Sequence, residues 1–341
     1  MRLAVLGGSH GGFTTAADLA LAGHRVRLWA RSKEALGPLL DEPTLMLFAE
    51  GRQGSARLDR ATTDLAEAVE GAEVLIAPLP ATSHDELAKR LAPHVNERQI
   101  VLLTPGTLGS LALARGLARA GVRAANLPTG VFPASRTDAV LARLAELFPA
   151  MRRCADALDV ALTNAGPVIH PPLVLLNTGP IDGGRFDIHV QGTTATVRRL
   201  IDAVDAERVA TRRGWGYPAP HYELATYYDE ARAAEGFYGA GARGRVAQSR
   251  IFDETLGLEH RYVTEDVVLG LSLLESAARA AGVATPATTG LLLVFGVLLG
   301  RELSGDGRAL EHLGLGDLSR REIRVFLEEG WASQIWRKVV Q

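Results

Sequence analysis

The first half of the chain alternates between two hydrophobic periods. Short apolar runs at residues 2–6, 25–30, 73–77 and 99–103 are typical of buried strands. Segments with one apolar face at helical spacing lie between or after these runs, at 13–21, 64–69, 83–92, 110–120 and 137–147. Strands that alternate with helices predict an α/β fold with a doubly wound parallel sheet.

The pattern changes near residue 152. No later run is typical of a strand, and longer apolar segments follow at 157–162, 173–176, 197–204, 267–281 and 288–302. Their periodicity favours helices. We therefore expect an α/β domain over 1–152 and an all-α domain over 153–341, which fits a chain of 341 residues at roughly 100–200 residues per domain.

Composition and charge exclude several classes of protein. The formal net charge of -2 lacks the basic excess of a nucleic-acid-binding protein. No apolar run approaches the ~20 residues of a membrane-spanning helix, and the N-terminus reaches Gly7 too early for a signal peptide. Cys154 is the only cysteine, so we expect neither an internal disulfide nor a cysteine-rich metal site. These features predict a cytoplasmic globular protein.

A glycine-rich turn follows the first predicted strand and opens the first helix. The turn, Gly7-Gly8-Ser9-His10-Gly11-Gly12, lies where dinucleotide-binding proteins hold a pyrophosphate with backbone amides and a helix N-terminus. Gly7 would make the tight turn, and Gly12 would allow helix and strand to pack closely. Ser9 replaces the middle glycine of G-x-G-x-x-G, so a turn without a ligand is the alternative. Position and context favour nucleotide binding.

The residues after the second predicted strand bear on the choice of nicotinamide cofactor. An acidic residue there bonds the ribose 2′-hydroxyl of NAD, whereas arginine accommodates the 2′-phosphate of NADP. The strand is followed by Arg31, Ser32 and Lys33, with no acid before Glu34. Arg31 and Ser32 therefore favour NADP over NAD, and a solvated basic loop is the alternative.

His170 precedes two prolines in the second half of the chain. A residue before proline is biased toward an extended backbone, so we expect His170 in a break between helices. Histidine suits proton transfer near neutral pH, which makes His170 a candidate general acid. A structural histidine is the alternative, because the chain has nine histidines.

A second polar cluster runs from His260 to Asp266 and precedes a predicted helix. We expect Thr264 to cap that helix. Glu265 and Asp266 suit a first helical turn, where the helix dipole stabilises acidic side chains, and Arg261 suits an exposed surface. Local sequence alone therefore assigns no chemistry to this cluster.

The order of these motifs resembles the opine dehydrogenase family, which includes octopine and nopaline dehydrogenases. The resemblance spans nearly the whole chain, and its histidine–proline and arginine–tyrosine motifs are more specific than the glycine turn. It rests on residues 5–12, Leu103-Thr104-Pro105-Gly106, Asn164 with His170-Pro171-Pro172, Arg261-Tyr262 with Glu265-Asp266, Val283-Ala284-Thr285-Pro286 and residues 307–315.

The resemblance implies a fold and a reaction. The fold is a Rossmann domain followed by an all-α domain like the C-terminal domain of phosphogluconate dehydrogenase. The reaction joins the amino group of an amino acid to a 2-oxo acid such as pyruvate, and NAD(P)H reduces the resulting imine. His170 matches the catalytic histidine of the family, Asp266 the acid that orients it, and Arg261 an arginine that holds a substrate carboxylate. Asn164 is a further substrate-binding candidate.

The cofactor-binding candidates form a set of their own. They are Gly7, Gly8, Ser9, His10, Gly11, Gly12, Arg31, Ser32, Pro80 and Thr104. We expect an amino acid and a 2-oxo acid as small-molecule partners, a homodimer as the oligomer to test, and no nucleic acid, membrane or metal ion. Besides Ser9, the chain departs from the pattern of the family in two places. Gly166 stands where a second asparagine is frequent, and the stretch between Gly106 and Phe132 is shorter.

Two other functions stay open. A relative with the same two domains could reduce a 2-oxo acid to a hydroxy acid, as ketopantoate reductase does, without any amine. A non-catalytic NADP-binding sensor would keep the glycine turn, but it has no need of a proton donor such as His170. The requirement for an amine separates the first of these from an opine dehydrogenase.

Overall fold

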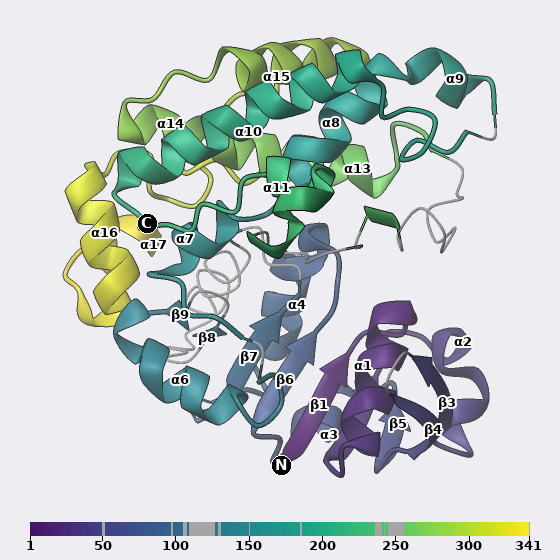
Figure 1. Cartoon of the computed structure of the whole chain (residues 1–341). Coiled ribbons are helices and arrows are strands. Elements are labelled where there is room, and N and C mark those ends of the chain that lie inside the picture. Colours follow the sequence, from purple (N-terminus) through teal and green to yellow (C-terminus); the bar gives the residue numbers. More distant parts are fainter. Residues whose placement is uncertain are drawn as a thin grey trace. The chain divides into compact units, whose positions relative to one another are not determined.

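A computed structural model describes residues 1–49, 52–96, 98–104, 127–128, 131–149, 151–184, 186–235 and 256–340, together with positions 108, 241, 243 and 244. The chain divides into two compact units, Met1–Val160 with Arg324–Gln341 and Ala161–Ile323. Figure 1 shows the parallel strands in the first unit and helices throughout the second. The α/β and all-α classes expected for the two halves are confirmed.

The extents of the two units differ from the expected domains 1–152 and 153–341. The last residues pack with the first unit, because the Phe326 ring lies 5.1 Å from the Phe132 ring, and both side chains are fully buried. The Trp331 ring contacts both of them at 5.7 Å. An aromatic cluster therefore holds the C-terminal segment against a strand that precedes it by nearly two hundred positions.

A five-stranded parallel sheet forms the centre of the first unit, in the order β5-β2-β1-β6-β7. The strands are β1 (Arg2–Leu6), β2 (Arg25–Trp29), β5 (Arg60–Thr62), β6 (Val74–Ala77) and β7 (Ile100–Leu103). Strands β6 and β7 are buried at every position, as expected of a sheet covered on both faces. The four predicted strands correspond to β1, β2, β6 and β7. Their carboxyl ends meet at one edge, and the strand order reverses at β1.

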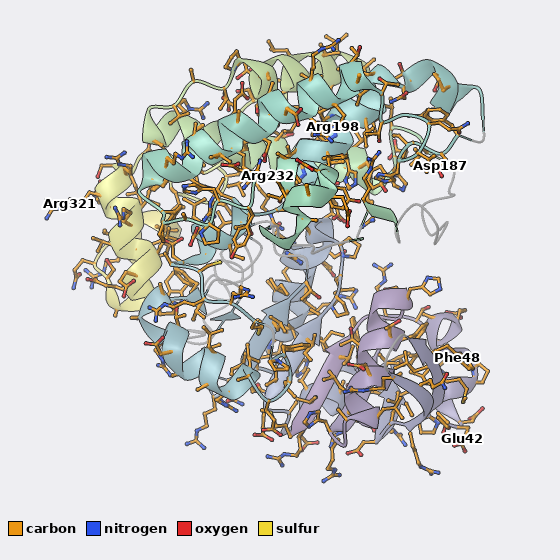
Figure 2. The ribbon with its side chains drawn as sticks, in the orientation of Figure 1. Glu42, Phe48, Asp187, Arg198, Arg232 and Arg321 are labelled. Atoms are coloured by element: carbon orange, nitrogen blue, oxygen red, sulfur yellow. The ribbon has the colours of Figure 1, made fainter. Side chains whose placement is uncertain are left out.

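An antiparallel hairpin of β3 (Thr44–Ala49) and β4 (Arg52–Arg57) was missed by the hydrophobic pattern. Leu47 packs on Ala17 of the first helix, with Leu45 beside them, whereas Phe48 on the opposite face of β3 is 79% exposed. Figure 2 labels Phe48 on this hairpin. The alternation of two faces is present, but apolar side chains on the exposed face hid it.

Helices and short elements complete the first unit. Helices α1 and α3 both contact β1 and β2. The predicted helix at 110–120 and most of the shortened stretch after Gly106 lie outside the described residues. The elements are α1 (His10–Leu21), α2 (Lys33–Leu36), η1 (Gly37–Leu40), α3 (Leu65–Val69), η2 (Ala81–Ser83), α4 (His84–Leu91), β8 (Leu127–Pro128), β9 (Val131–Phe132), η3 (Ala134–Arg136), α6 (Thr137–Leu144), α7 (Ala157–Ala161), η6 (Gly330–Ala332) and α17 (Trp336–Val340).

The second unit is built around α10 (Ala195–Trp215), the longest helix among its described residues, which packs on other helices of the unit (Figure 1). Thr194 caps its start, and Gly216 ends it in the left-handed conformation that favours glycine. The other elements are α8 (Gly166–Leu176), α9 (Thr178–Asp182), α11 (Ala225–Tyr228), η4 (Glu230–Glu235), α13 (Arg261–Thr264), η5 (Asp266–Leu271), α14 (Ser272–Ala281) and α15 (Pro286–Leu299). Helix α16 (Arg320–Glu329) begins in the second unit, and its residues from Arg324 onward belong to the first. Across the described ranges, no helix has the length and apolar character that crossing a membrane requires.

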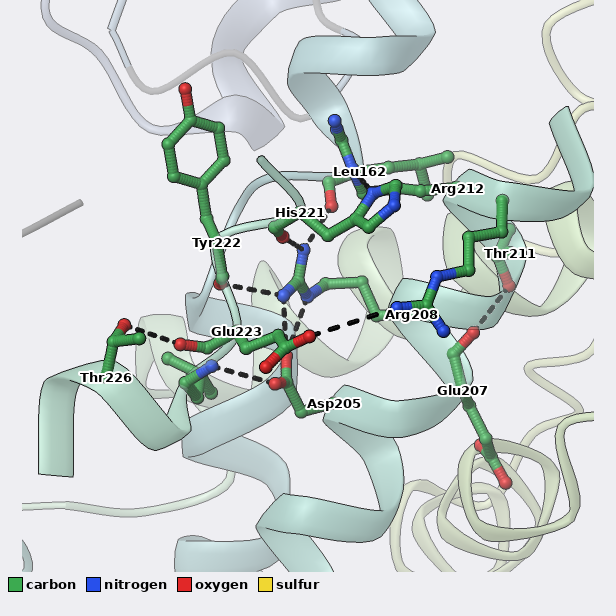
Figure 3. A network of polar contacts seen from close by, with 12 residues as sticks. Leu162, Asp205, Glu207, Arg208, Thr211, Arg212, His221, Tyr222, Glu223 and Thr226 are labelled. Atoms are coloured by element: carbon green, nitrogen blue, oxygen red, sulfur yellow. Dashed lines mark hydrogen bonds and ion pairs between the residues drawn. The ribbon is translucent and has the colours of Figure 1, made fainter. Parts of the chain in front are cut away.

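A buried polar network fixes a loop against α10. Arg208 is 2% exposed and donates through Nε and Nη2 to Oδ1 of Asp205, at 2.9 and 2.7 Å. It also donates to the backbone carbonyls of Leu162, His221 and Tyr222, as Figure 3 shows. These bonds hold the loop that follows α10, where Tyr222 has a positive φ of 54°.

Candidate active site

His170 lies inside α8, so its expected place in a helix break is wrong. Pro171 and Pro172 follow it within the same helix. Each proline lacks the amide that would continue the helical ladder, a loss that normally breaks a helix. Here the helix continues because both prolines are buried and α8 packs on α10, α13 and η5. Tertiary packing thus overrides the local preference and holds His170 on a rigid element.

Asp266 begins a π-helical turn, η5, which the sequence did not predict. The amide of Gly270 donates to the carbonyl of Glu265, which closes a wider turn than in an α-helix. The expected cap at Thr264 is wrong, because the helical segment starts earlier, at Arg261, with His260 as its N-cap. Single π-turns occur frequently at functional sites.

His170 and Asp266 form a close pair although 96 positions separate them. His170 Nδ1 lies 2.7 Å from Asp266 Oδ2, and the two side chains are only 16% and 15% exposed. A carboxylate can only accept, so Nδ1 carries the proton in this bond, and Nε2 remains for another partner. An aspartate that orients a histidine in this way is a typical arrangement for acid–base chemistry.

Two glycines allow α8 and η5 to approach closely enough for this pair. A Cβ atom at Gly166 would lie 2.4 Å from Asp266 Oδ1. A Cβ atom at Gly270 would lie 2.1 Å from Cγ of Pro167. Both distances are too short for any side chain. Glycine at position 166, where the resembled family frequently has asparagine, therefore leaves room for the Asp266 carboxylate.

Tyr262 and His189 complete the surroundings of His170, and sequence reasoning missed both. The fully buried Tyr262 ring stacks on the imidazole of His170, with centroids 3.7 Å apart and planes 15° from parallel. His189 Nε2 lies 2.9 Å from the Tyr262 hydroxyl. Tyr262 was part of a quoted motif, but no local pattern marks His189.

Arg261 and Asn164 lie in the same unit as the pair. The exposed Arg261 guanidinium lies 5.5 Å from the Tyr262 ring centroid and has neither a hydrogen bond nor an ion pair to another described residue. Such a group is suited to binding a carboxylate from a ligand. Asn164 Oδ1 accepts a hydrogen bond from the Gly166 amide at 3.0 Å, so part of this side chain shapes the turn before α8.

The glycine turn at the end of β1 has the geometry of a phosphate cradle. A Cβ atom at Gly12 would lie 1.8 Å from the Gly7 carbonyl oxygen, so only glycine permits this contact between helix and strand. Gly8 is enclosed by Ala30 and Ala35. Ser9 caps α1 without a side-chain hydrogen bond, and Ser9, His10 and Gly11 are exposed. The turn therefore presents the N-terminus of a three-turn helix to solvent, and a pyrophosphate fits it.

The residues after β2 differ in whether their side chains are free to bind a phosphate. Arg31 is exposed, with no hydrogen bond or ion pair to another described residue. Ser32 caps α2 by accepting from the Ala35 amide at 3.4 Å. The pKa of the Glu34 carboxyl is lowered by a hydrogen bond from its own backbone amide and by one from the Ser32 hydroxyl. Arg31 is thus the better placed of the two predicted phosphate ligands.

Pro80 and Thr104 lie at the same sheet edge as the glycine turn. Pro80 follows β6 and caps η2, and Thr104 follows β7, where its amide donates to the Ala77 carbonyl at 3.2 Å. Because the five strands are parallel, the residues that follow β1, β2, β6 and β7 gather at their carboxyl ends. Open α/β sheets bind ligands at that edge.

Comparison with known protein families matches both halves of the chain. Residues 153–299 match the alpha-helical domain of NAD/NADP octopine/nopaline dehydrogenase. Residues 2–123 match the N-terminus of NAD-dependent glycerol-3-phosphate dehydrogenase. An opine dehydrogenase from Arthrobacter sp. (strain 1C) is 29% identical over 95% of this chain and 98% of its own length. Over nearly its whole length the chain is therefore similar to opine dehydrogenases.

Solved structures agree with this octopine dehydrogenase-like fold. An octopine dehydrogenase in complex with NADH and agmatine has a TM-score of 0.70 at 17% identity, over 95% of this chain and 97% of the other. An octopine dehydrogenase with NADH and pyruvate has a TM-score of 0.65 at 18% identity, over 93% and 96%. At these identities the likeness shows the fold.

Proposed function

We propose that this octopine dehydrogenase-like protein is an NAD(P)H-dependent oxidoreductase that condenses an amino acid or amine with a 2-oxo acid such as pyruvate and reduces the resulting imine. The observation that carries the proposal is the 2.7 Å contact between His170 and Asp266. Arg261 and Tyr262 stand five and four positions before Asp266, in the motif that resembles the family. The agmatine and pyruvate of the octopine dehydrogenase complexes support this substrate class.

The residues of the second unit would divide the chemistry between them. The Arg261 guanidinium binds a substrate carboxylate and orients the carbon that reacts. With Nδ1 bonded to Asp266, His170 holds its transferable proton at Nε2. That proton passes to the oxygen that leaves as water when amine and ketone condense. The nicotinamide, when bound, supplies the hydride that reduces the imine carbon.

The residues of the first unit would hold the cofactor. The backbone amides of 8–12 and the N-terminus of α1 bind the pyrophosphate, and Pro80 and Thr104 lie along the same edge of the sheet. We propose NADP as the preferred cofactor, with NAD as the alternative, because exposed Arg31 follows β2. The cytoplasmic location expected from the sequence stays a prediction.

The test is the oxidation of NADPH by the purified protein, followed as loss of absorbance. Each member of a panel of 2-oxo acids is supplied with and without pooled amino acids, and NADH replaces NADPH in a parallel series. Oxidation that requires both substrates supports the proposal. Oxidation with a 2-oxo acid alone assigns the protein to the hydroxy-acid-forming reductases. Cofactor binding without any turnover in either series favours a sensor.

We further propose a homodimer that forms through α15. Leu293 and Val297 on this helix are 65% and 82% exposed, and Val294 and Leu298 beside them are also exposed. The same helix borders a groove of about 480 Å³ with Leu303 at its wall. Leu293 and Val297 also line this groove, and an exposed apolar helix face of this kind suits a two-fold contact between identical surfaces. Sedimentation velocity should show a dimer that Val297→Glu converts to a monomer, and a monomeric wild type would refute this contact.

A further inference from the structure

The aromatic ring of Tyr262 packs against His170 but takes no direct part in the proposed reaction. The Tyr262 ring lies 3.7 Å from the imidazole centroid and 15° from its plane, and Tyr262 is fully buried. A stacked ring at this distance restrains rotation of the imidazole about its side-chain bonds. The hydrogen bond to Asp266 restrains only one edge of that ring. The two contacts together define the plane of the imidazole and the direction in which Nε2 points.

His189 anchors the tyrosine through its hydroxyl. Its Nε2 lies 2.9 Å from the Tyr262 oxygen. His189 itself is held by a local turn, in which Asp187 Oδ1 accepts from the His189 amide at 3.1 Å and Thr193 donates to the His189 carbonyl at 2.8 Å. A local turn outside α8 and α13 therefore helps to position His189.

The charge state of His189 suits this role. Burial is the main cause that lowers its pKa to about 4, and neighbouring His170 and Arg261 lower it further while Asp187 opposes them. His189 is therefore neutral near pH 7. Its ring centroid lies 5.6 Å from that of His170, so a charged His189 would repel a protonated His170. A neutral His189 can hydrogen-bond to the Tyr262 hydroxyl without that repulsion.

We propose that Tyr262 and His189 form a positioning pair for His170, in which the tyrosine ring fixes the plane of the imidazole and His189 fixes the tyrosine. Neither residue transfers a proton to substrate. The inference rests on the proposed function for its kinetic consequence. Its structural content, the orientation of His170, is measurable without any substrate.

The experiment compares Tyr262→Leu, Tyr262→Phe and His189→Asn by NMR of ¹³C,¹⁵N-histidine-labelled protein and by kinetics. The His170 signals are assigned with His170→Asn. Tyr262→Leu should move the ring-proton signals of His170 downfield, because the shielding face of the tyrosine is gone, and should lower kcat ~10²-fold with little change in KM. Tyr262→Phe keeps the ring, so it should retain the His170 shifts and lose less than about tenfold in kcat. Tyr217→Leu, which removes another buried tyrosine of the same unit, is the matched control.

The proposal is overturned if Tyr262→Leu leaves the His170 signals in place, or if Tyr262→Phe shifts them as far as Tyr262→Leu does. Should Tyr262→Leu fail to fold, His189→Asn decides. Loss of the anchor is expected to broaden the His170 signals through added motion, and unchanged signals refute the pair. If the wild type turns over no substrate, the proposed function fails while the NMR comparison still tests the positioning pair.

Discussion

Gly166 lies directly against the carboxylate of Asp266. A Cβ atom at this glycine would be 2.4 Å from Oδ1, while the other oxygen of the same carboxylate is bonded to His170. The absence of a side chain at position 166 is therefore a condition for the pair. A side chain at position 166 could be accommodated only if the Asp266 carboxylate moved, and that carboxylate orients His170.

Gly166→Ala should therefore displace Asp266 and reduce catalysis. We expect kcat to fall about 10²-fold, because small misplacements of reacting groups have effects of that size. Gly290→Ala on α15 is the matched control, since a Cβ atom there meets nothing within 4 Å. Steady-state kinetics of both variants, with circular dichroism to verify folding, measure the effect. A folded Gly166→Ala protein with wild-type kcat would show that the pair tolerates displacement of Asp266.

Removal of the imidazole should separate cofactor binding from turnover. His170→Ala is expected to lower kcat by ~10²–10⁴, the usual range for a lost general acid, and to leave NADP(H) affinity unchanged. His312→Ala replaces an exposed histidine of the same unit and should change neither quantity. Titration of cofactor fluorescence and initial rates provide the two measurements. Near-normal turnover in the folded variant would remove His170 from the mechanism.

Arg31 should determine the preference for NADP. Arg31→Asp is expected to weaken NADP⁺ binding by about 10- to 100-fold, the equivalent of one charge-assisted hydrogen bond, and to leave NAD⁺ binding nearly unchanged. Arg25→Asp is the matched control, because Arg25 begins the same strand and lies at the amino edge of the parallel sheet. Calorimetric titration with both nucleotides gives the affinities. An unaltered ratio would place recognition of the 2′-phosphate elsewhere.

Much of the fold follows from hydrophobic period, because buried parallel strands and apolar helix faces are continuous local signals. Strands β1, β2, β6 and β7 were predictable for this reason. The hairpin β3–β4 was not, since exposed Met46 and Phe48 place apolar side chains on both of its faces. The three-residue strand β5 is too short to show a period.

The candidate site was predictable only where residues belong to motifs. Arg261, Asp266 and His170 were found through the resemblance to a family, since 96 positions separate the last two. Within the π-turn that begins at Asp266, Gly270 packs against Pro167, and this tertiary contact leaves no local signal in the sequence. His189 has no motif, and only the folded chain brings it to Tyr262.

Breaking the buried pair of Arg208 and Asp205 should strongly destabilise the second unit. Arg208→Met leaves the Asp205 carboxylate buried beside the Leu224 amide, its one remaining donor among the described residues, and is expected to lower the free energy of unfolding by about 3–5 kcal/mol. The double variant Arg208→Met with Asp205→Leu should recover part of the loss, because no buried charge is left alone. Urea denaturation measures both. A loss under about 1 kcal/mol in the single variant would indicate that water reaches the site.

His189 should make the stability of the protein sensitive to mild acid. The unfolded residue takes up its proton near its ordinary pKa of 6.5, whereas in the folded protein burial lowers the pKa to about 4. Between these values the unfolded state binds more protons, so stability falls as the pH drops through that window and the loss is complete below it. The expected contribution is at most about 3 kcal/mol.

His189→Gln tests this dependence because glutamine can still bond the Tyr262 hydroxyl but does not titrate. Urea denaturation at pH 7 and pH 4.5 should show a smaller loss of stability in His189→Gln than in the wild type. Other groups titrate equally in both proteins, so the difference between the two profiles isolates His189. His312→Gln, which alters an exposed histidine, should follow the wild type. Parallel profiles for His189→Gln and the wild type would mean that His189 titrates alike in the folded and unfolded chains. The inference that His189 is held neutral by burial would then be wrong.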